Sequence, residues 1–255
     1  MSTILITNDD GIHSPGLAAL KKGLAPLGRI VVVAPDRDNS AISHALTMHR
    51  PLRLTELESD VYTLDGTPTD CVSIALSKVF DHPPDLLVSG INNGPNIGDD
   101  ITYSGTVSAA IEGTMYAVAS LAVSMAGEPP FDYTHSEPII RKLARKVLDN
   151  GLPASTLMNV NIPDRVPVKG IKVTRQGRRI WKQAVQEVTD PRGRMHYWIG
   201  GGTPLLDSGK DTDVHVLSEG FVSISPIHLD LTNHEGISYF KEDLKLELFA
   251  ASDDG

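Results

Sequence analysis

The stretch that decides the fold covers residues 4–35 and reads ILITNDDGIHSPGLAALKKGLAPLGRIVVVAP. It begins with a short apolar run that predicts a buried strand, and a second such run follows at 30–34. Between them, Ser14 followed by Pro15 is typical of a helix start, and leucines then recur at near-helical spacing. A strand, a helix and a strand in this order predict a parallel βαβ unit.

The alternation of apolar runs and helical patterns continues up to about residue 165. Residues 36–66 interrupt it, with alternating apolar and polar residues at 51–54 and 61–64 that predict a small antiparallel hairpin. Further helices are expected at 67–79, 104–117 and 136–150, and further strands at 85–89, 121–124 and 158–162. This pattern predicts an α/β fold with a Rossmann-like, mostly parallel sheet flanked by helices.

Beyond this core the pattern changes. Strand-like runs at 171–174, 195–199 and 221–224 are separated by polar, glycine-rich stretches, and helical periodicity is absent until about residue 236. Both tryptophans, Trp181 and Trp198, lie here, with Tyr197 beside one of them. These aromatic residues predict a contact between copies of the chain, or else a cover over the flank of the sheet in the monomer.

Composition and charge exclude several classes of partner. The 255 residues carry 23 Lys and Arg against 32 Asp and Glu, and the net charge of -9 opposes binding to duplex nucleic acid or anionic membranes. No apolar run approaches the roughly 18 residues that span a bilayer, and the chain start lacks a basic signal region. The single cysteine, Cys71, forms no internal disulfide. We therefore expect a cytoplasmic protein with a small-molecule ligand.

Two adjacent carboxylates, Asp9 and Asp10, stand where the first strand ends. In open α/β sheets, ligands bind outside the carboxyl ends of the strands. Adjacent carboxylates repel unless a cation or a proton lies between them, and Gly11 lets the backbone turn so that both can reach one ion. The pair therefore predicts a divalent metal site. The alternative is a plain turn whose acids cap the next helix.

Two later segments have the composition of ligand-binding loops. Residues 90–100 hold three glycines and three asparagines, whose neutral oxygens suit Mg²⁺, Mn²⁺ or Ca²⁺, unless the segment is only a long solvated turn. Ser104-Gly105-Thr106, at a helix start, offers free N–H groups and two hydroxyls to a phosphate, unless Ser104 is only an N-cap. The glycine motifs of dinucleotide-binding and P-loop proteins are absent, as are histidine pairs of the H-x-x-x-H and H-E-x-x-H types.

Five ordered motifs of the N-terminal half resemble those of the SurE (survival protein E) nucleotidases. They are Thr7-Asn8-Asp9-Asp10-Gly11, Ala34-Pro35-Asp36 with Ser40, Gly66-Thr67-Pro68-Thr69-Asp70-Cys71, Ser89-Gly90-Ile91-Asn92-Asn93-Gly94-Pro95-Asn96 and Tyr103-Ser104-Gly105-Thr106-Val107. The similarity continues to Gly220-Phe221-Val222-Ser223-Ile224-Ser225-Pro226 and covers nearly the whole chain.

The resemblance implies both an architecture and an activity. Residues 1–165 would form the catalytic core, and residues 166–255 would carry an extended β-hairpin arm and a terminal helix that build homodimers or homotetramers. The activity would be that of a phosphoric monoester hydrolase, similar to an acid phosphatase and dependent on one Mg²⁺ or Mn²⁺ per subunit. Its substrates would be nucleoside 5′-monophosphates, with 3′-monophosphates and short polyphosphate as further candidates.

The resemblance also assigns roles to individual residues. The metal ligands would be Asp9, Asp10, Ser40 and Asn92, with the two aspartates at the catalytic centre, and the phosphate would be held by Asn96, Ser104, Gly105 and Thr106. We expect direct attack by water on the phosphate, with an aspartyl-phosphate intermediate as the alternative. A metal- and nucleotide-binding sensor without catalysis would use the same ligands, and it is the alternative function.

Overall fold

The computed structural model describes residues 1–164, 167–182, 185–200, 203–206 and 209–244. One sheet runs through its centre, with the strands in the following spatial order. They are β3 (Leu54–Glu58), β4 (Val61–Leu64), β2 (Gly28–Pro35), β1 (Ser2–Thr7), β5 (Leu86–Asn93), β6 (Ser120–Met125), β7 (Thr156–Ile162), β13 (Val222–His228) and β8 (Ile171–Val173). All neighbours from β4 to β7 are parallel, whereas β3 and β13 run antiparallel to β4 and β7. The predicted α/β class is confirmed.

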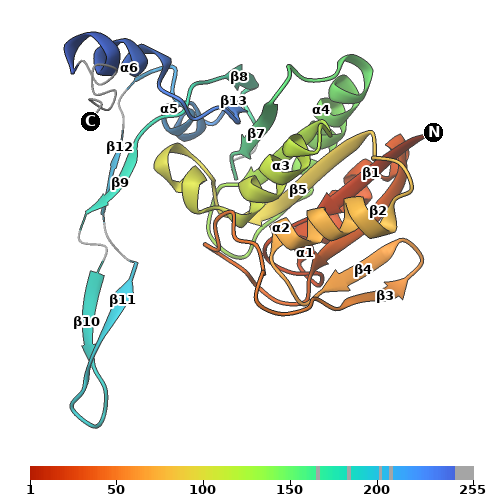
Figure 1. The fold of residues 1–255 in the computed structure, drawn as a ribbon, viewed down its shortest axis with the longest axis horizontal. Helices are drawn as coiled ribbons and strands as arrows, with labels where there is room; N and C mark the ends of the chain where they lie inside the picture. Colours follow the sequence, from red (N-terminus) through yellow and green to blue (C-terminus); the bar gives the residue numbers. More distant parts are fainter. Residues whose placement is uncertain (165–166, 183–184, 201–202, 207–208, 245–255) are drawn as a thin grey trace, which may run out of the picture.

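Helices cover both faces of the sheet (Figure 1). On one face α1 (Pro15–Leu24) packs beside α4 (Ser136–Asn150), and on the other α2 (Pro68–Ile74) packs beside α3 (Gly105–Met115). Because side chains alternate along a strand, Ile4 and Ile6 belong to the core beneath α1 and α4, whereas Leu5 belongs to the core beneath α2 and α3. The result is a three-layer arrangement in which the central strands are buried on both sides.

The cap-then-proline pairs do start helices. The Ser14 hydroxyl accepts a hydrogen bond from the Gly16 N–H at 3.2 Å, and Pro15 opens α1. Thr67 and Asp70 form a reciprocal capping box at the start of α2, with distances of 2.9 and 3.0 Å. These contacts satisfy N–H groups that a helix start leaves without partners.

Two elements differ from the sequence pattern. β5 continues to Asn93, into the stretch expected to be a loop, and its register against β6 shifts between Ser89 and Asn92. A short helix, α5 (Asp213–Ser218), lies where helical structure was not expected, so that prediction was wrong. Six residues are too few to show a helical period, and the signal that remains is the Thr212 cap, which accepts from the His215 N–H at 3.2 Å.

A two-stranded arm extends away from the sheet (Figure 1). Near its base β9 (Arg179–Lys182) pairs antiparallel with β12 (Thr203–Leu206), and farther out β10 (Val185–Thr189) pairs with β11 (Met195–Ile199). Tyr197 and Trp198 are 63% and 68% exposed, so they do not cover the flank of the sheet, and that alternative was wrong. The side chain of Trp181 lies outside the described part of the structure.

After β13 the chain forms the short helix α6 (His234–Ser238), which continues as a helical turn over Tyr239–Asp243. Helical structure near residue 236 was expected, and it is confirmed. Within the described chain, no helix has the length and apolar character needed to cross a bilayer. The strands β8 and β13 belong to the predicted C-terminal region, 166–255, yet they pair into the central sheet. The sheet therefore contains strands from both predicted regions.

Candidate active site

The carboxyl ends of β1 and β5 lie side by side because the two strands pair in parallel, with Thr7 opposite Ser89. The chain continues from β1 to β2 on one side, whereas β5 lies on the other, so this is a switch point of the sheet. A pocket of about 320 Å³ opens there. It is lined by Asp9, Ser40, Ala41, Asn92, Asn93, Asn96, Asp100, Tyr103 and Ser104, five of which are predicted site residues.

Asp9 is almost fully buried, with 3% exposure, and it faces the start of α3. The Thr106 N–H donates to its Oδ2 at 3.1 Å, and the Thr106 hydroxyl donates to its Oδ1. A Cβ atom on Gly105 would lie 2.8 Å from the Asp9 Cβ, so the helix can approach this closely only with glycine there. Burial raises the pKa of Asp9, and the hydrogen bonds from Thr106 oppose that rise.

Asp10 is half-buried and, unlike Asp9, is not among the residues that line the pocket. Burial, followed by the negative charge of Asp9, raises the pKa of Asp10 to about 6, and Asp38 adds to the repulsion. The Oδ2 of Asp10 and the Oδ1 of Asn8 are buried, and neither has a hydrogen-bond partner within the described structure. Buried acceptors without donors are rare in folded proteins. A cation between the carboxylates would relieve both the repulsion and the missing contacts.

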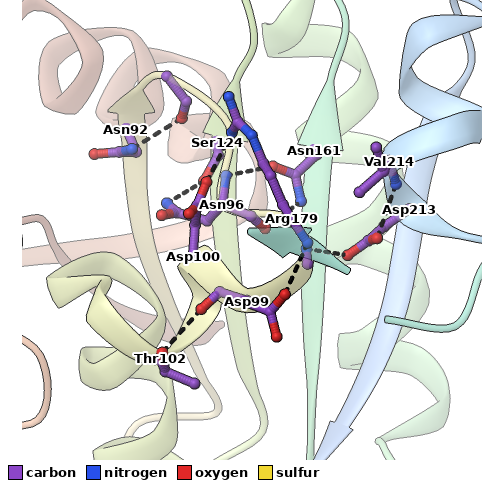
Figure 2. Close-up of polar contacts among 12 residues, drawn as sticks. Asn92, Asn96, Asp99, Asp100, Thr102, Ser124, Asn161, Arg179, Asp213 and Val214 are labelled. Carbon is purple, nitrogen blue, oxygen red and sulfur yellow. Dashed lines mark hydrogen bonds and ion pairs between the residues drawn. The ribbon is translucent and has the colours of Figure 1, made fainter. Parts of the chain in front are cut away.

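The other two predicted metal ligands, Ser40 and Asn92, line the pocket together with Asp9. The Ser40 hydroxyl donates to Asp38 at 2.6 Å, and the Asn39 N–H ties the same loop to the Asp9 carbonyl at 2.7 Å. The Asn92 side chain donates to the Gly94 carbonyl at 2.8 Å, which leaves its amide oxygen for the pocket (Figure 2).

The donors fit a hard divalent cation. Two carboxylates, a hydroxyl and an amide are the oxygen ligands that Mg²⁺ and Mn²⁺ accept. In the part of the chain that the structure describes, no group of three or more His, Cys, Asp or Glu residues gathers in metal-binding geometry. A metal at this site would therefore depend on the neutral oxygens as well as on Asp9 and Asp10.

The start of α3 forms the phosphate side of the site. The Ser104 hydroxyl accepts from the Val107 N–H at 3.1 Å, so the N-cap role is confirmed, and the hydroxyl hydrogen can still be donated. The N–H of Gly105 belongs to the first turn, where helices leave donors without intrahelical partners. Thr106 donates both its backbone N–H and its hydroxyl hydrogen to Asp9, a contact that the sequence did not predict. Its role in binding phosphate stays a prediction.

Asn96 is held by buried polar residues of two neighbouring strands (Figure 2). Its side chain donates to Ser124 of β6 at 2.8 Å, and its backbone N–H donates to the Asn161 side chain at 2.8 Å. Asn159 and Asn161 of β7 both donate to its carbonyl at 2.9 Å. Sequence reasoning missed these two supporting residues. The available signal was their presence, as asparagines, in a strand predicted to be buried.

The C-terminal half also contributes to this wall of the pocket. The buried Asp213 carboxylate accepts from the Gly98 N–H at 2.9 Å and from the Gly177 N–H at 2.8 Å. Arg179, at the base of the arm, forms a 2.8 Å ion pair with Asp100 (Figure 2). No local sequence signal indicates these contacts, because Asp213 lies 115 residues from Gly98 and 36 from Gly177, and Arg179 lies 79 residues from Asp100.

The family model described as "Survival protein SurE" matches residues 4–183, which is more than half of the chain. The chain belongs to the SurE family. The resemblance of its sequence motifs to this family is thereby confirmed, over a region that includes every predicted site residue.

Curated relatives and a solved structure agree with this assignment. A protein of Syntrophotalea carbinolica named 5'-nucleotidase SurE is 53% identical over 232 residues, or 90% of this chain and 92% of its own length. A protein of the same name from Geobacter sulfurreducens is 47% identical over 239 residues, or 92% and 91% of the two chains. The crystal structure of SurE protein from Aquifex aeolicus superimposes with a TM-score of 0.82 at 42% identity, covering 94% of this chain and all of its own.

The raised pKa of Asp10 makes a prediction about the metal-free protein. Its pKa of about 6 in the folded state exceeds the usual value, which means that folding favours the protonated carboxyl. The stability that this preference contributes is present at low pH and is lost as pH rises through 6. We expect Asp10→Asn to raise the melting temperature by about 3 °C at pH 8 in the presence of a chelator, and to have no such effect at pH 4. Differential scanning calorimetry across this range, with Asp149→Asn as the exposed-carboxylate control, measures it. An equal effect at both pH values would contradict the prediction.

Proposed function

We propose that this SurE family member hydrolyses nucleoside 5′-monophosphates to nucleoside and phosphate, with one bound Mg²⁺ or Mn²⁺ per subunit. Nucleoside 3′-monophosphates and short polyphosphate are further proposed substrates. The protein is a phosphoric monoester hydrolase, in keeping with relatives that bear the name 5'-nucleotidase SurE over nine-tenths of the chain. The observation that carries the proposal is the buried Asp9 carboxylate, which is followed by the half-buried Asp10 and is held against the N-terminus of α3 at one pocket.

We assign the metal to Asp9, Asp10, Ser40 and Asn92, in agreement with the oxygen donors described above. When bound, a divalent cation supplies Lewis-acid polarisation of the phosphoryl group and lowers the pKa of a coordinated water. Thr106 orients the Asp9 carboxylate through its two hydrogen bonds, and it would have to exchange them in order to reach a phosphate.

The phosphate would bind at Asn96, Ser104 and Gly105. The Ser104 hydroxyl and the Gly105 N–H lie at the positive end of an eleven-residue helix, where donors stabilise the negative charge that develops on phosphate oxygens. Direct attack by water is the proposed chemistry. Both oxygens of Asp9 already accept hydrogen bonds, which weakens this carboxylate as a nucleophile. A phosphoprotein trapped by rapid acid quench would instead favour an aspartyl-phosphate intermediate.

The first test is phosphate release from a panel of nucleoside monophosphates in EDTA, in Mg²⁺ and in Mn²⁺. Asp9→Asn removes one negative ligand, so we expect kcat/KM to fall about 100-fold or more while the circular dichroism spectrum is retained. Asp149→Asn is the control for loss of an exposed carboxylate. Binding of metal and nucleotide without any phosphate release would instead support the sensor function.

Thr106 provides a second test that leaves the ligands in place. Thr106→Val keeps the shape of the buried side chain but removes the hydroxyl that donates to Asp9, whereas Thr106→Ser keeps that donor. We expect the valine variant to bind Mn²⁺ about 10-fold more weakly and the serine variant to bind it as the unmodified protein does. Isothermal titration calorimetry measures both affinities, and equal binding by the two variants would count against the orienting role.

We also propose that the arm joins copies of this chain into homodimers or homotetramers. Its outer strands expose Val185, Tyr197, Trp198 and Ile199, more apolar surface than a solvated hairpin needs. We expect Trp198→Glu to weaken self-association about 30-fold, because a buried tryptophan is a typical anchor of an interface. Sedimentation velocity measures this, with Leu57→Glu on the exposed strand β3 as the control. An unmodified protein that sediments as a monomer at micromolar concentration would contradict the proposal.

The cytoplasmic location stays a prediction.

A further inference from the structure

One aromatic ring at the pocket has no ring or hydrogen-bond partner among the residues that the structure describes. Tyr103 lines the pocket together with Asp9, Asn96 and Ser104, yet it is 65% exposed. Its ring stacks on no aromatic side chain, and its hydroxyl makes no hydrogen bond, within the described chain. Large aromatic side chains usually contribute their area to a core or to an interface. Folding of the monomer therefore does not explain this ring.

The backbone beneath the ring is held firmly. The Tyr103 carbonyl accepts from the Ser43 N–H at 3.0 Å, and the neighbouring Thr102 carbonyl accepts from the Ser43 hydroxyl at 2.8 Å. The next residue, Ser104, caps α3. Consecutive Cα atoms are about 3.8 Å apart, so the ring is anchored next to the proposed phosphate-binding turn. Tyr103 and Ser104 both line the pocket, so the tyrosine side chain and the Ser104 hydroxyl border the same space.

We propose that Tyr103 is the stacking platform for the base of the bound nucleotide. This inference rests on the proposed function, because it requires a phosphate at Ser104 and Gly105. A nucleoside monophosphate carries its base one ribose away from the phosphate, and a free aromatic face one residue from the phosphate site matches that arrangement. The base and the tyrosine ring would then bury apolar surface that is exposed to water in the free protein.

A second aromatic pocket is the rival location for the base. It measures about 500 Å³, is lined by Pro129, Pro130, Phe131 and Tyr133, and shares only Asn93 with the pocket described above. The Phe131 and Tyr133 rings already stack on each other, with centroids 6.2 Å apart, and the Tyr133 hydroxyl donates to Asn93. Both rings also pack against the core. Tyr103 is favoured because its face is free and because it lines the same pocket as the proposed ligands.

Stacking also sets the expected range of substrates. Every base has a π-face, so a platform without hydrogen bonds to the base edges accepts all bases and favours the larger purines modestly. The protein would then distinguish phosphate monoesters that carry a base from those that do not. AMP and ribose 5-phosphate form a matched pair for this comparison, because they share the phosphate and the sugar.

The experiment compares kcat/KM for AMP and for ribose 5-phosphate in saturating Mn²⁺. We expect the ratio of the two values to fall about tenfold in Tyr103→Leu and to stay within about twofold in Tyr103→Phe, which keeps the ring. Tyr116→Leu makes the same change at another exposed tyrosine outside the pocket and should leave the ratio unaltered. Phe131→Leu tests the rival pocket and should leave it unaltered too.

The outcomes separate the two proposals. An unmodified protein that hydrolyses neither compound would overturn the proposed function. Hydrolysis with equal ratios in the unmodified protein and Tyr103→Leu, or a loss confined to Phe131→Leu, would overturn the stacking role while leaving the phosphatase in place. A fall in the Leu variant that the Phe variant restores supports the platform, since loss of the hydroxyl alone leaves the ring.

Discussion

The parallel pairing of β1 with β5 is the constraint on which the site depends. Because Thr7 lies opposite Ser89, the chain leaves both strands at the same edge of the sheet, and Asp9 meets residues that follow far later in the sequence. The helix after β5 begins at that edge as well, so its N-terminus faces Asp9. Glycine at position 105 then allows close approach, and Thr106 binds both carboxylate oxygens of Asp9. Without this pairing the acids would be an ordinary turn.

Buried polar groups hold the rest of the pocket in place. Polar atoms removed from water require hydrogen-bond partners, which is why Asn96 is bonded to residues of β6 and β7 on several sides. Asp213 does the same for the backbone at Gly98 from the C-terminal half of the chain. The pocket wall and the base of the arm are thus joined through Asp213 and through the Arg179–Asp100 pair. The base of the arm and the pocket wall are therefore held to each other by direct contacts.

Much of this arrangement could be predicted before the structure was known. The apolar runs and cap-then-proline pairs located β1, β2, α1 and α2 because they report local burial and local hydrogen bonding. Polar residues after strands indicated the site because parallel strands end at one edge. The extension of β5 and the helix α5 were missed. Both are decided by neighbours distant in sequence, β6 in one case and the segments bonded to Asp213 in the other.

The sequence by itself determined the fold class, the family and the side chains that gather at the switch point, since these follow from periodicity and ordered motifs. Only the tertiary structure decided how those side chains are used. It assigned the Thr106 donors to Asp9, left the Oδ2 of Asp10 without a donor among the described residues, and placed Asn159, Asn161 and Asp213 behind the pocket. It also left Tyr103 free and Trp198 exposed. The physical reason is that burial and hydrogen bonding between distant segments depend on three-dimensional packing, which local spacing does not encode.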